Sequence, residues 1–205
     1  MRQKLKDSVS EAVRAIQALE KEESLRFIEK SALKIEECFA KGGKLLIAGN
    51  GGSLCDAMHF AEEITGVFRK KRRALPAIAL SCPGHLTCVA NDLSFEEVFA
   101  RGVEAFGRPE DILVVLTTSG NSANVAKAFK AARSIGLGTI AFLGKTGGRL
   151  KGICDLELVV EGFSFSDRVQ EVHMAAIHII IEMVEQKLFY ENASESPCSS
   201  CSLMS

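Results

Sequence analysis

The segment Lys44-Leu-Leu-Ile-Ala-Gly-Asn-Gly-Gly-Ser53 decides how the chain folds. A short apolar run leads directly into a glycine-rich loop, and residues 54–65 after it have the apolar spacing of a helix. The same order recurs, with further apolar runs at residues 77–80, 111–116, 139–143 and 156–160. Five apolar strands separated by helices predict an α/β fold, in which a five-stranded parallel sheet is covered by helices on both faces.

The two ends of the chain differ from this alternation. Residues 4–41 carry apolar side chains at three- and four-residue steps, which predicts one or two amphipathic helices with a break near residues 22–24. A long helix over about residues 166–189 is expected to close the fold. We therefore expect an N-terminal helical element over residues 1–41, an α/β domain over 42–189, and a disordered tail over the Ser-rich residues 190–205.

The overall composition narrows the class of protein. The 205 residues include 25 basic and 26 acidic side chains, and a net charge of −1 argues against a nucleic-acid or membrane-surface partner. Seven cysteines at irregular spacings predict free thiols in a reducing compartment, and the Cys198-x-x-Cys201 pair has no second pair to complete a metal site. No apolar stretch is long enough to span a bilayer. We expect a soluble, cytoplasmic protein.

Two loops at strand ends are rich in glycine and hydroxyl groups. They are Gly49-Asn-Gly-Gly-Ser53 and Thr117-Thr-Ser-Gly-Asn-Ser122, and each is followed by a helical pattern. Glycines let the backbone approach a ligand, and a helix start directs free N–H groups at an anion. One such loop could simply cap its helix with a serine, but two loops on one sheet edge favour a binding site for a phosphomonoester.

Two predicted helices carry side chains suited to metal binding or proton transfer. His59 and Glu63 are four residues apart, so they share one helix face, and Gln170 and His178 are eight residues apart on the last long helix. Solvated helix faces often carry such His/Glu pairs, and glutamine is an uncommon metal ligand, so spacing alone leaves both interpretations open. His173 lies about 140° around its helix from His178 and is expected to be structural.

These segments together resemble the sugar-phosphate isomerase (SIS) domain family and, within it, the phosphoheptose isomerases. The resemblance runs from about residue 4 to residue 189 and rests on residues 49–63, 91–92, 117–124 and 167–173 together with His178. Thr117 stands where relatives often have serine, and Leu54 replaces a residue that is frequently polar. The resemblance implies a homotetramer whose active sites are shared between subunits.

The resemblance also assigns roles to residues of this sequence. It implies one zinc ion per subunit, bound by His59, Glu63, Gln170 and His178, with Glu63 and His178 as the acid–base pair. It implies that the sugar phosphate is bound by Asn50, Gly51, Gly52, Ser53, Glu63, Asn91, Asp92, Thr117, Thr118, Ser119, Ser122 and Gln170. Asp167 lies next to these residues in sequence, and a role for it in opening the sugar ring is a hypothesis.

The function implied by the resemblance is the conversion of sedoheptulose 7-phosphate to D-glycero-D-manno-heptose 7-phosphate through an enediol. That reaction is the first step in bacterial synthesis of heptose precursors for lipopolysaccharide core and heptosylated glycans. The alternatives are a non-catalytic SIS-domain tetramer that binds a protein partner such as a replication initiator, a sugar-phosphate sensor, and an isomerase for another sugar phosphate. The presence of both Glu63 and His178 favours the enzyme.

Overall fold

The computed structural model describes residues 1–190 and confirms the predicted sheet. The strands are β1 (Leu45–Gly49), β2 (Ala77–Ala79), β3 (Ile112–Thr117), β4 (Gly138–Gly144) and β5 (Leu156–Val160). Their order is β2-β1-β3-β4-β5, and every neighbouring pair is parallel. β1 and β3 are neighbours, with Gly49 opposite Leu116, so the loops that follow these two strands leave the sheet side by side.

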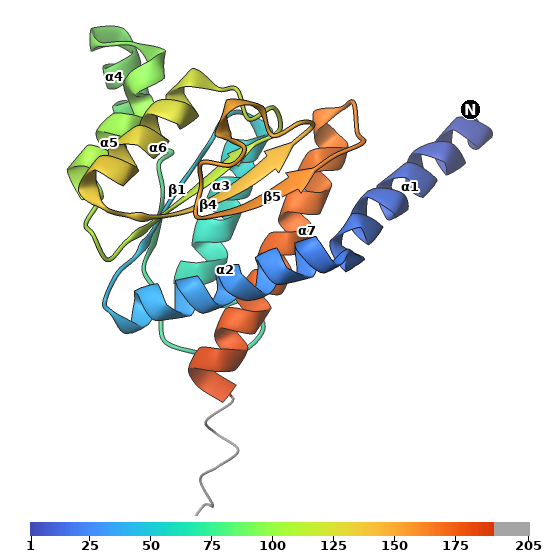
Figure 1. The fold of residues 1–205 in the computed structure, drawn as a ribbon, viewed down its shortest axis with the longest axis horizontal. Helices are drawn as coiled ribbons and strands as arrows, with labels where there is room; N and C mark the ends of the chain where they lie inside the picture. Colours follow the sequence, from blue (N-terminus) through green and yellow to red (C-terminus); the bar gives the residue numbers. More distant parts are fainter. Residues whose placement is uncertain (191–205) are drawn as a thin grey trace, which may run out of the picture.

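Helices cover both faces of the sheet (Figure 1). One face packs against α2 (Glu22–Ala40), α3 (Gly52–Thr65) and α7 (Ser166–Glu185), and the opposite face packs against α4 (Pro83–Asp92), α5 (Val98–Phe106) and α6 (Ala123–Ile135). α1 (Arg2–Gln17) contacts α7 and then projects away from the rest of the chain. Short turns complete the order: η1 (Ala18–Glu20), η2 (Phe95–Glu97), η3 (Gly148–Leu150) and the π-helical η4 (Gln186–Tyr190).

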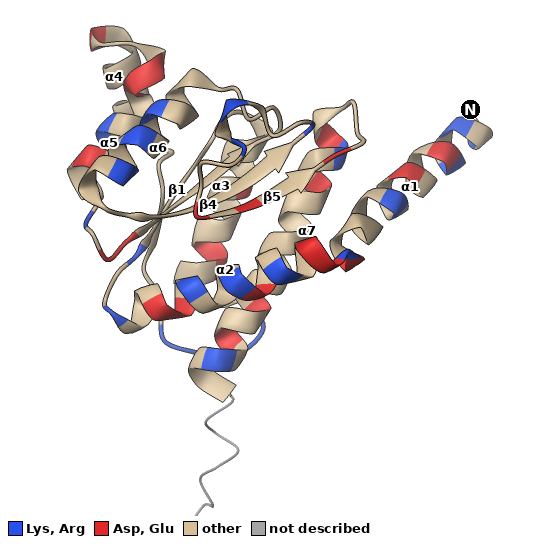
Figure 2. Cartoon of the chain, viewed as in Figure 1, with Lys and Arg blue, Asp and Glu red and all other residues tan. Residues whose placement is uncertain are grey.

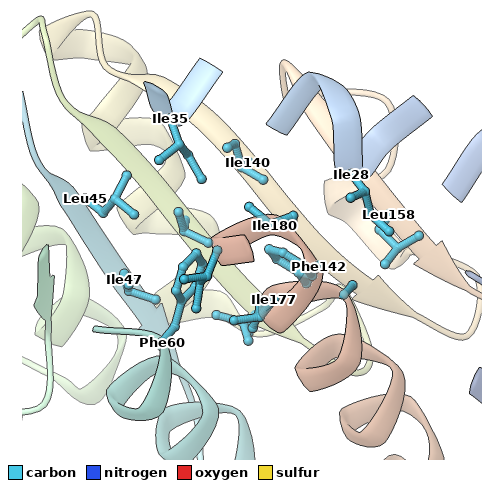
Figure 3. Close-up of a cluster of buried hydrophobic side chains, with 14 of the residues drawn as sticks. Ile28, Ile35, Leu45, Ile47, Phe60, Ile140, Phe142, Leu158, Ile177 and Ile180 are labelled. Atoms are coloured by element: carbon cyan, nitrogen blue, oxygen red, sulfur yellow. The ribbon is translucent and has the colours of Figure 1, made fainter. Parts of the chain in front are cut away.

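The core between the sheet and α3 and α7 holds these two helices against the same surface (Figure 3). Phe60 of α3 and Ile177 of α7 are fully buried against Ile47 and Phe142 of the sheet. Full burial of a side chain of this size stabilises the fold by about 2 kcal/mol. Phe27 and Ile35 of α2 belong to the same cluster, so the N-terminal element packs on the core. The boundary between this element and the α/β domain, placed between residues 41 and 42, stays a prediction.

The structure adds one helix to the predicted elements and shifts one helix boundary. Residues 83–92, to which no element was assigned, form α4, which begins with Pro83 in the first helical turn, where its missing N–H costs no hydrogen bond. His85 on this helix is half-buried, with Nε2 2.8 Å from the Val98 carbonyl oxygen. The first two helices separate at residues 18–21 instead of 22–24, because Lys21 adopts an extended backbone.

The predicted tail lies almost wholly outside the described residues. Tyr190, assigned to that tail, instead ends η4. The remaining tail residues, with Cys198 and Cys201, fall beyond residue 190.

Acidic and basic side chains are interspersed along α1, α2 and α7, as expected for a net charge near zero (Figure 2). Within residues 1–190, no helix has the length and apolar character needed to cross a membrane.

His173 is structural, as its position on the helix predicted. The side chain is fully buried between α7 and β4, and its Nε2 lies 3.1 Å from the Leu143 carbonyl oxygen. Burial lowers the pKa of His173 to about 4, because the charged imidazolium has no access to water there.

This shift makes stability depend on pH. The unfolded chain binds a proton at His173 below its ordinary pKa near 6.5 and the folded chain does not, so His173 costs about 2 kcal/mol of stability at pH 5 relative to pH 8. Glutamine places an amide near the position of Nε2 and does not titrate. The free energy of unfolding, measured with urea, should therefore fall less between pH 8 and pH 5 in the His173→Gln variant than in the wild type. The difference between the two proteins should be about 2 kcal/mol. Equal losses in both proteins would contradict the assignment.

Candidate active site

The two polar loops lie next to each other at the carboxyl edge of the sheet, as predicted. The Asn50 and Asn124 side-chain amides exchange two hydrogen bonds, of 2.8 and 2.9 Å, which join the first loop to the start of α6. Asn124 is 3% exposed, and its Oδ1 also accepts a bond from its neighbour's backbone N–H. No role was predicted for Asn124, because its partner Asn50 is distant in sequence and its burial depends on the fold.

Glycine is required at specific places in these loops. Gly51 and Gly120 have φ values of +55° and +65°, a region that side-chain-bearing residues rarely adopt. A Cβ atom at Gly120 would overlap the carbonyl group of Gly147. A Cβ atom at Gly52 would overlap the side-chain amide of Gln170, so α7 brings Gln170 directly against the first loop.

The hydroxyl groups of the second loop fall into two sets. Thr117 is buried, and its Oγ1 accepts a hydrogen bond of 3.2 Å from the Gly120 N–H, so this side chain shapes the loop from within. Thr118, Ser119 and Ser122 are half-buried and accessible from the sheet edge. Thr118 Oγ1 lies 3.1 Å from the hydroxyl of Ser166, a second residue without a predicted role.

His59, Glu63 and His178 converge from two helices. His59 Nε2 lies 3.1 Å from His178 Nε2 and 3.4 Å from Glu63 Oε1, and the ligand atoms of all three residues lie within 4.8 Å of one another. Two residues come from α3 and one from α7, so the cluster exists because these helices pack side by side. This convergence favours a metal or proton-transfer site over the alternative that His59 and Glu63 are simply a pair on a solvated helix face.

The spacing within this cluster fits a metal ion. Two ligand atoms of a tetrahedral zinc ion, each about 2.0 Å from the metal, lie about 3.3 Å apart. The His59–His178 and His59–Glu63 separations of 3.1 and 3.4 Å bracket this value. Two imidazoles and a carboxylate are a ligand set that zinc prefers, and Glu63 is well shielded from water, with 18% of its side chain exposed.

His178 sits in a partly desolvated environment. The ring of Phe68 stacks on its imidazole with centroids 5.8 Å apart, and the Arg69 guanidinium lies over Phe68 and forms an ion pair with Glu182. Burial lowers the pKa of His178, the positive charges of His59 and Arg69 lower it further, and Glu63 opposes them. A lowered pKa favours the neutral imidazole, which is the form that binds a metal or accepts a proton.

Asp56 is a further acidic group beside this cluster that sequence analysis missed. It lies one turn before His59 on α3, and its Oδ2 is buried without a hydrogen-bond partner among residues 1–190. Burial raises the pKa of Asp56 to about 6, with His59 acting in the opposite direction. In the sequence, Asp56 is one polar residue between Gly52 and His59, and nothing in that pattern predicts that it is buried.

The structure does not bring every predicted residue to this cluster. Asn91 and Asp92 are exposed at the end of α4, on the opposite face of the sheet, where the Asn91 amide donates to Asp92 at 2.7 Å. Asp167 is exposed in the first turn of α7, 3.7 Å from the Arg168 guanidinium. The assigned roles of these three residues stay predictions.

Comparisons with known proteins agree with this arrangement. The family model described as the SIS domain matches residues 8–144, so this chain is a SIS-domain protein. The phosphoheptose isomerase of Fusobacterium nucleatum is 56% identical over 86% of this chain and 91% of its own length. The phosphoheptose isomerase of Vibrio cholerae is 47% identical over 90% of this chain and 97% of its own length. Within the SIS class, the chain belongs to the phosphoheptose isomerase family.

A solved structure shows the same fold. The phosphoheptose isomerase of Neisseria gonorrhoeae superposes with a TM-score of 0.84 at 36% identity, covering 90% of this chain and 98% of that one. The alternative of a non-catalytic, partner-binding SIS protein is not favoured, because the relatives are isomerases and the His59/Glu63/His178 cluster is intact.

The environment of His178 leads to a prediction about its titration. Replacing Phe68 with alanine admits water to the imidazole, so in metal-free protein the pKa of His178 should rise toward its ordinary value. The pH dependence of the histidine C2–H signals in NMR spectra measures this directly. Phe95→Ala, at an exposed position before α5, is the matched control and should leave the signal unchanged. An unchanged or lower pKa in the Phe68 variant would contradict the account.

Proposed function

We propose that this chain is an aldose–ketose isomerase that converts sedoheptulose 7-phosphate to D-glycero-D-manno-heptose 7-phosphate through an enediol. The observation that carries the proposal is the convergence of His59, Glu63 and His178 from α3 and α7, two helices that begin beside the polar loops. Membership of the phosphoheptose isomerase family supports this choice of substrate. By the same argument, the product enters the synthesis of bacterial heptose precursors in the cytoplasm.

The two loops bind the phosphate in this proposal. The N-termini of α3 and α6 both begin at the loops, so their positive dipole ends are directed at an anion there. Ser53, Thr118, Ser119 and Ser122 add hydroxyl donors, while Asn50 and the adjacent glycines contact the sugar chain. Binding energy from the phosphate, which does not react, positions C1 and C2 of the sugar.

Glu63 and His178 move the protons. The Glu63 carboxylate removes the proton from C1 of the ketose and returns one to C2, which converts the enediol to the aldose. The imidazole of His178, whose lowered pKa favours the neutral form, transfers protons at the C1 and C2 oxygens. Gln170, held against Gly52, donates its amide to the sugar oxygens between the loop and the cluster.

One zinc ion per subunit is part of the proposal, with His59, Glu63, Gln170 and His178 as the residues that hold it. When bound, zinc polarises the substrate carbonyl and stabilises negative charge on the enediol oxygens. The donor types of His59, Glu63 and His178 and the 3.1 to 3.4 Å distances from His59 Nε2 to the other two residues support the metal site, while Gln170 enters it from the family resemblance.

We also propose that the chain assembles as a homotetramer. α1 extends beyond the rest of the chain and carries Leu5, Val9 and Val13 at four-residue steps, each more than half exposed. A stripe of this kind is typical of a helix that packs against another copy.

The proposed reaction can be tested by mixing zinc-loaded protein with sedoheptulose 7-phosphate and following the carbonyl and anomeric signals by NMR. The wild type should form an aldoheptose 7-phosphate. Glu63→Gln should lower kcat by about 100- to 10,000-fold, since it removes the general base, and Glu29→Gln on the exposed face of α2 should not. No conversion by the folded, zinc-loaded wild type would refute the proposal, and full activity of the Glu63 variant would remove the proposed base.

The phosphate loop leads to a separate prediction. Ser122→Ala removes one hydrogen bond to a charged group, worth about 1.5 to 3 kcal/mol, so kcat/KM should fall about 10- to 150-fold. Ser134 is a matched control near the other end of α6, where its hydroxyl donates to the Lys130 carbonyl. Steady-state kinetics in which Ser122→Ala and Ser134→Ala behave alike would contradict the assignment of Ser122 to the phosphate.

A further inference from the structure

Arg72 is a buried arginine in an otherwise exposed basic segment, Arg69-Lys-Lys-Arg-Arg73, between α3 and β2. Its side chain is 1% exposed, and its Nε donates to Oε1 of Glu185, which is 3% exposed, at 2.5 Å. A buried guanidinium destabilises a protein unless its donors are satisfied. The contacts of the remaining donors therefore indicate what this side chain does.

Those donors bind the end of α3. Arg72 donates to the backbone carbonyl of Glu63 at 2.7 Å, of Ile64 at 3.0 Å and of Gly66 at 3.2 Å. The last carbonyls of a helix have no partner within the helix, and a positive charge at that end is favourable. The last turn of α3, Glu62-Glu-Ile-Thr65, has no basic side chain, so Arg72 supplies the positive charge at this end.

The same guanidinium reaches the helix that carries His178. Glu185 lies seven residues, or two turns, after His178, so the two side chains project from the same face of α7. Glu63 lies in the turn of α3 that Arg72 binds. One buried side chain thus connects the turn that carries Glu63 to the face of α7 that carries His178.

We propose that Arg72 is a positioning residue that fixes Glu63 relative to His59 and His178 by joining the end of α3 to Glu185. The inference rests on the proposed function in taking these three residues as metal ligands. A ligand set binds its ion tightly when its members are held within about 0.5 Å of the productive geometry, and the last turn of a helix frays without a cap. Arg72 supplies that cap and ties it to the second helix.

The test compares Arg72→Met with Lys44→Met in the full-length chain. Lys44 forms a partly buried ion pair with Asp111 just before β1, and neither residue belongs to the His59/Glu63/His178 cluster. Removing this ion pair lowers thermal stability but changes no residue of the cluster. Dissociation constants for Co²⁺ and Zn²⁺, measured by competition with a chelator, should rise at least 10-fold in Arg72→Met and stay within about twofold of wild type in Lys44→Met. Co²⁺ absorption reports the geometry of the site independently of activity.

A second measurement follows the end of α3 in metal-free protein. Amide hydrogen exchange at residues 63–66 should accelerate at least 10-fold in Arg72→Met, while exchange earlier in α3 changes less. If Arg72→Met does not fold, Arg72→Lys serves instead. It keeps the charge opposite Glu185 but cannot reach three carbonyls at once, so it should show smaller changes in the same direction.

The inference would be overturned if the Arg72 variants bound metal as tightly as the wild type and their amide hydrogen exchange at residues 63–66 were unchanged. Equal loss of affinity in Arg72→Met and Lys44→Met would do the same, because it would assign the effect to stability alone. A wild type that binds neither metal would instead refute the metal site of the proposed function. Hydrogen exchange would then decide whether Arg72 holds the end of α3.

Discussion

The packing of α3 and α7 side by side on one face of the sheet is the contact on which the candidate site depends. α3 carries His59 and Glu63, and α7 carries His178, so neither helix alone provides the cluster. Phe60 and Ile177, which lie next to these residues in sequence, are fully buried in the core beneath. Burial of these apolar side chains thus fixes both the fold and the spacing of the polar groups on the outer side of each helix.

Strand order supplies the second half of the site. Because β1 and β3 are neighbours in a parallel sheet, their loops meet at one edge, and the Asn50–Asn124 amide pair holds them together. α7 reaches the same edge with Gln170 against Gly52, and two turns further along it carries His178. A phosphate bound at the loops would therefore place the sugar chain along α7, toward the His/Glu/His cluster.

Sequence patterns predicted the sheet and the paired loops, because buried parallel strands and glycine-rich turns depend on local composition. The same patterns indicated His59, Glu63 and His178 through helical spacing, but whether two helix faces meet is a tertiary fact that spacing leaves open. Asn124, Asp56, Phe68 and Arg72 were missed for that reason, since each acts through a partner distant in sequence or through burial. α4 was missed because its Pro-Gly start resembles a turn.

The central claim is that two helices of this chain form a zinc site from His59, Glu63, Gln170 and His178. X-ray absorption at the zinc edge, on protein loaded with one equivalent of zinc per chain, tests it most directly. The account predicts a first shell of nitrogen and oxygen with the scattering of two imidazoles and no sulfur. A shell that contains sulfur, as Cys198 and Cys201 would supply, or fewer than two imidazoles would contradict it.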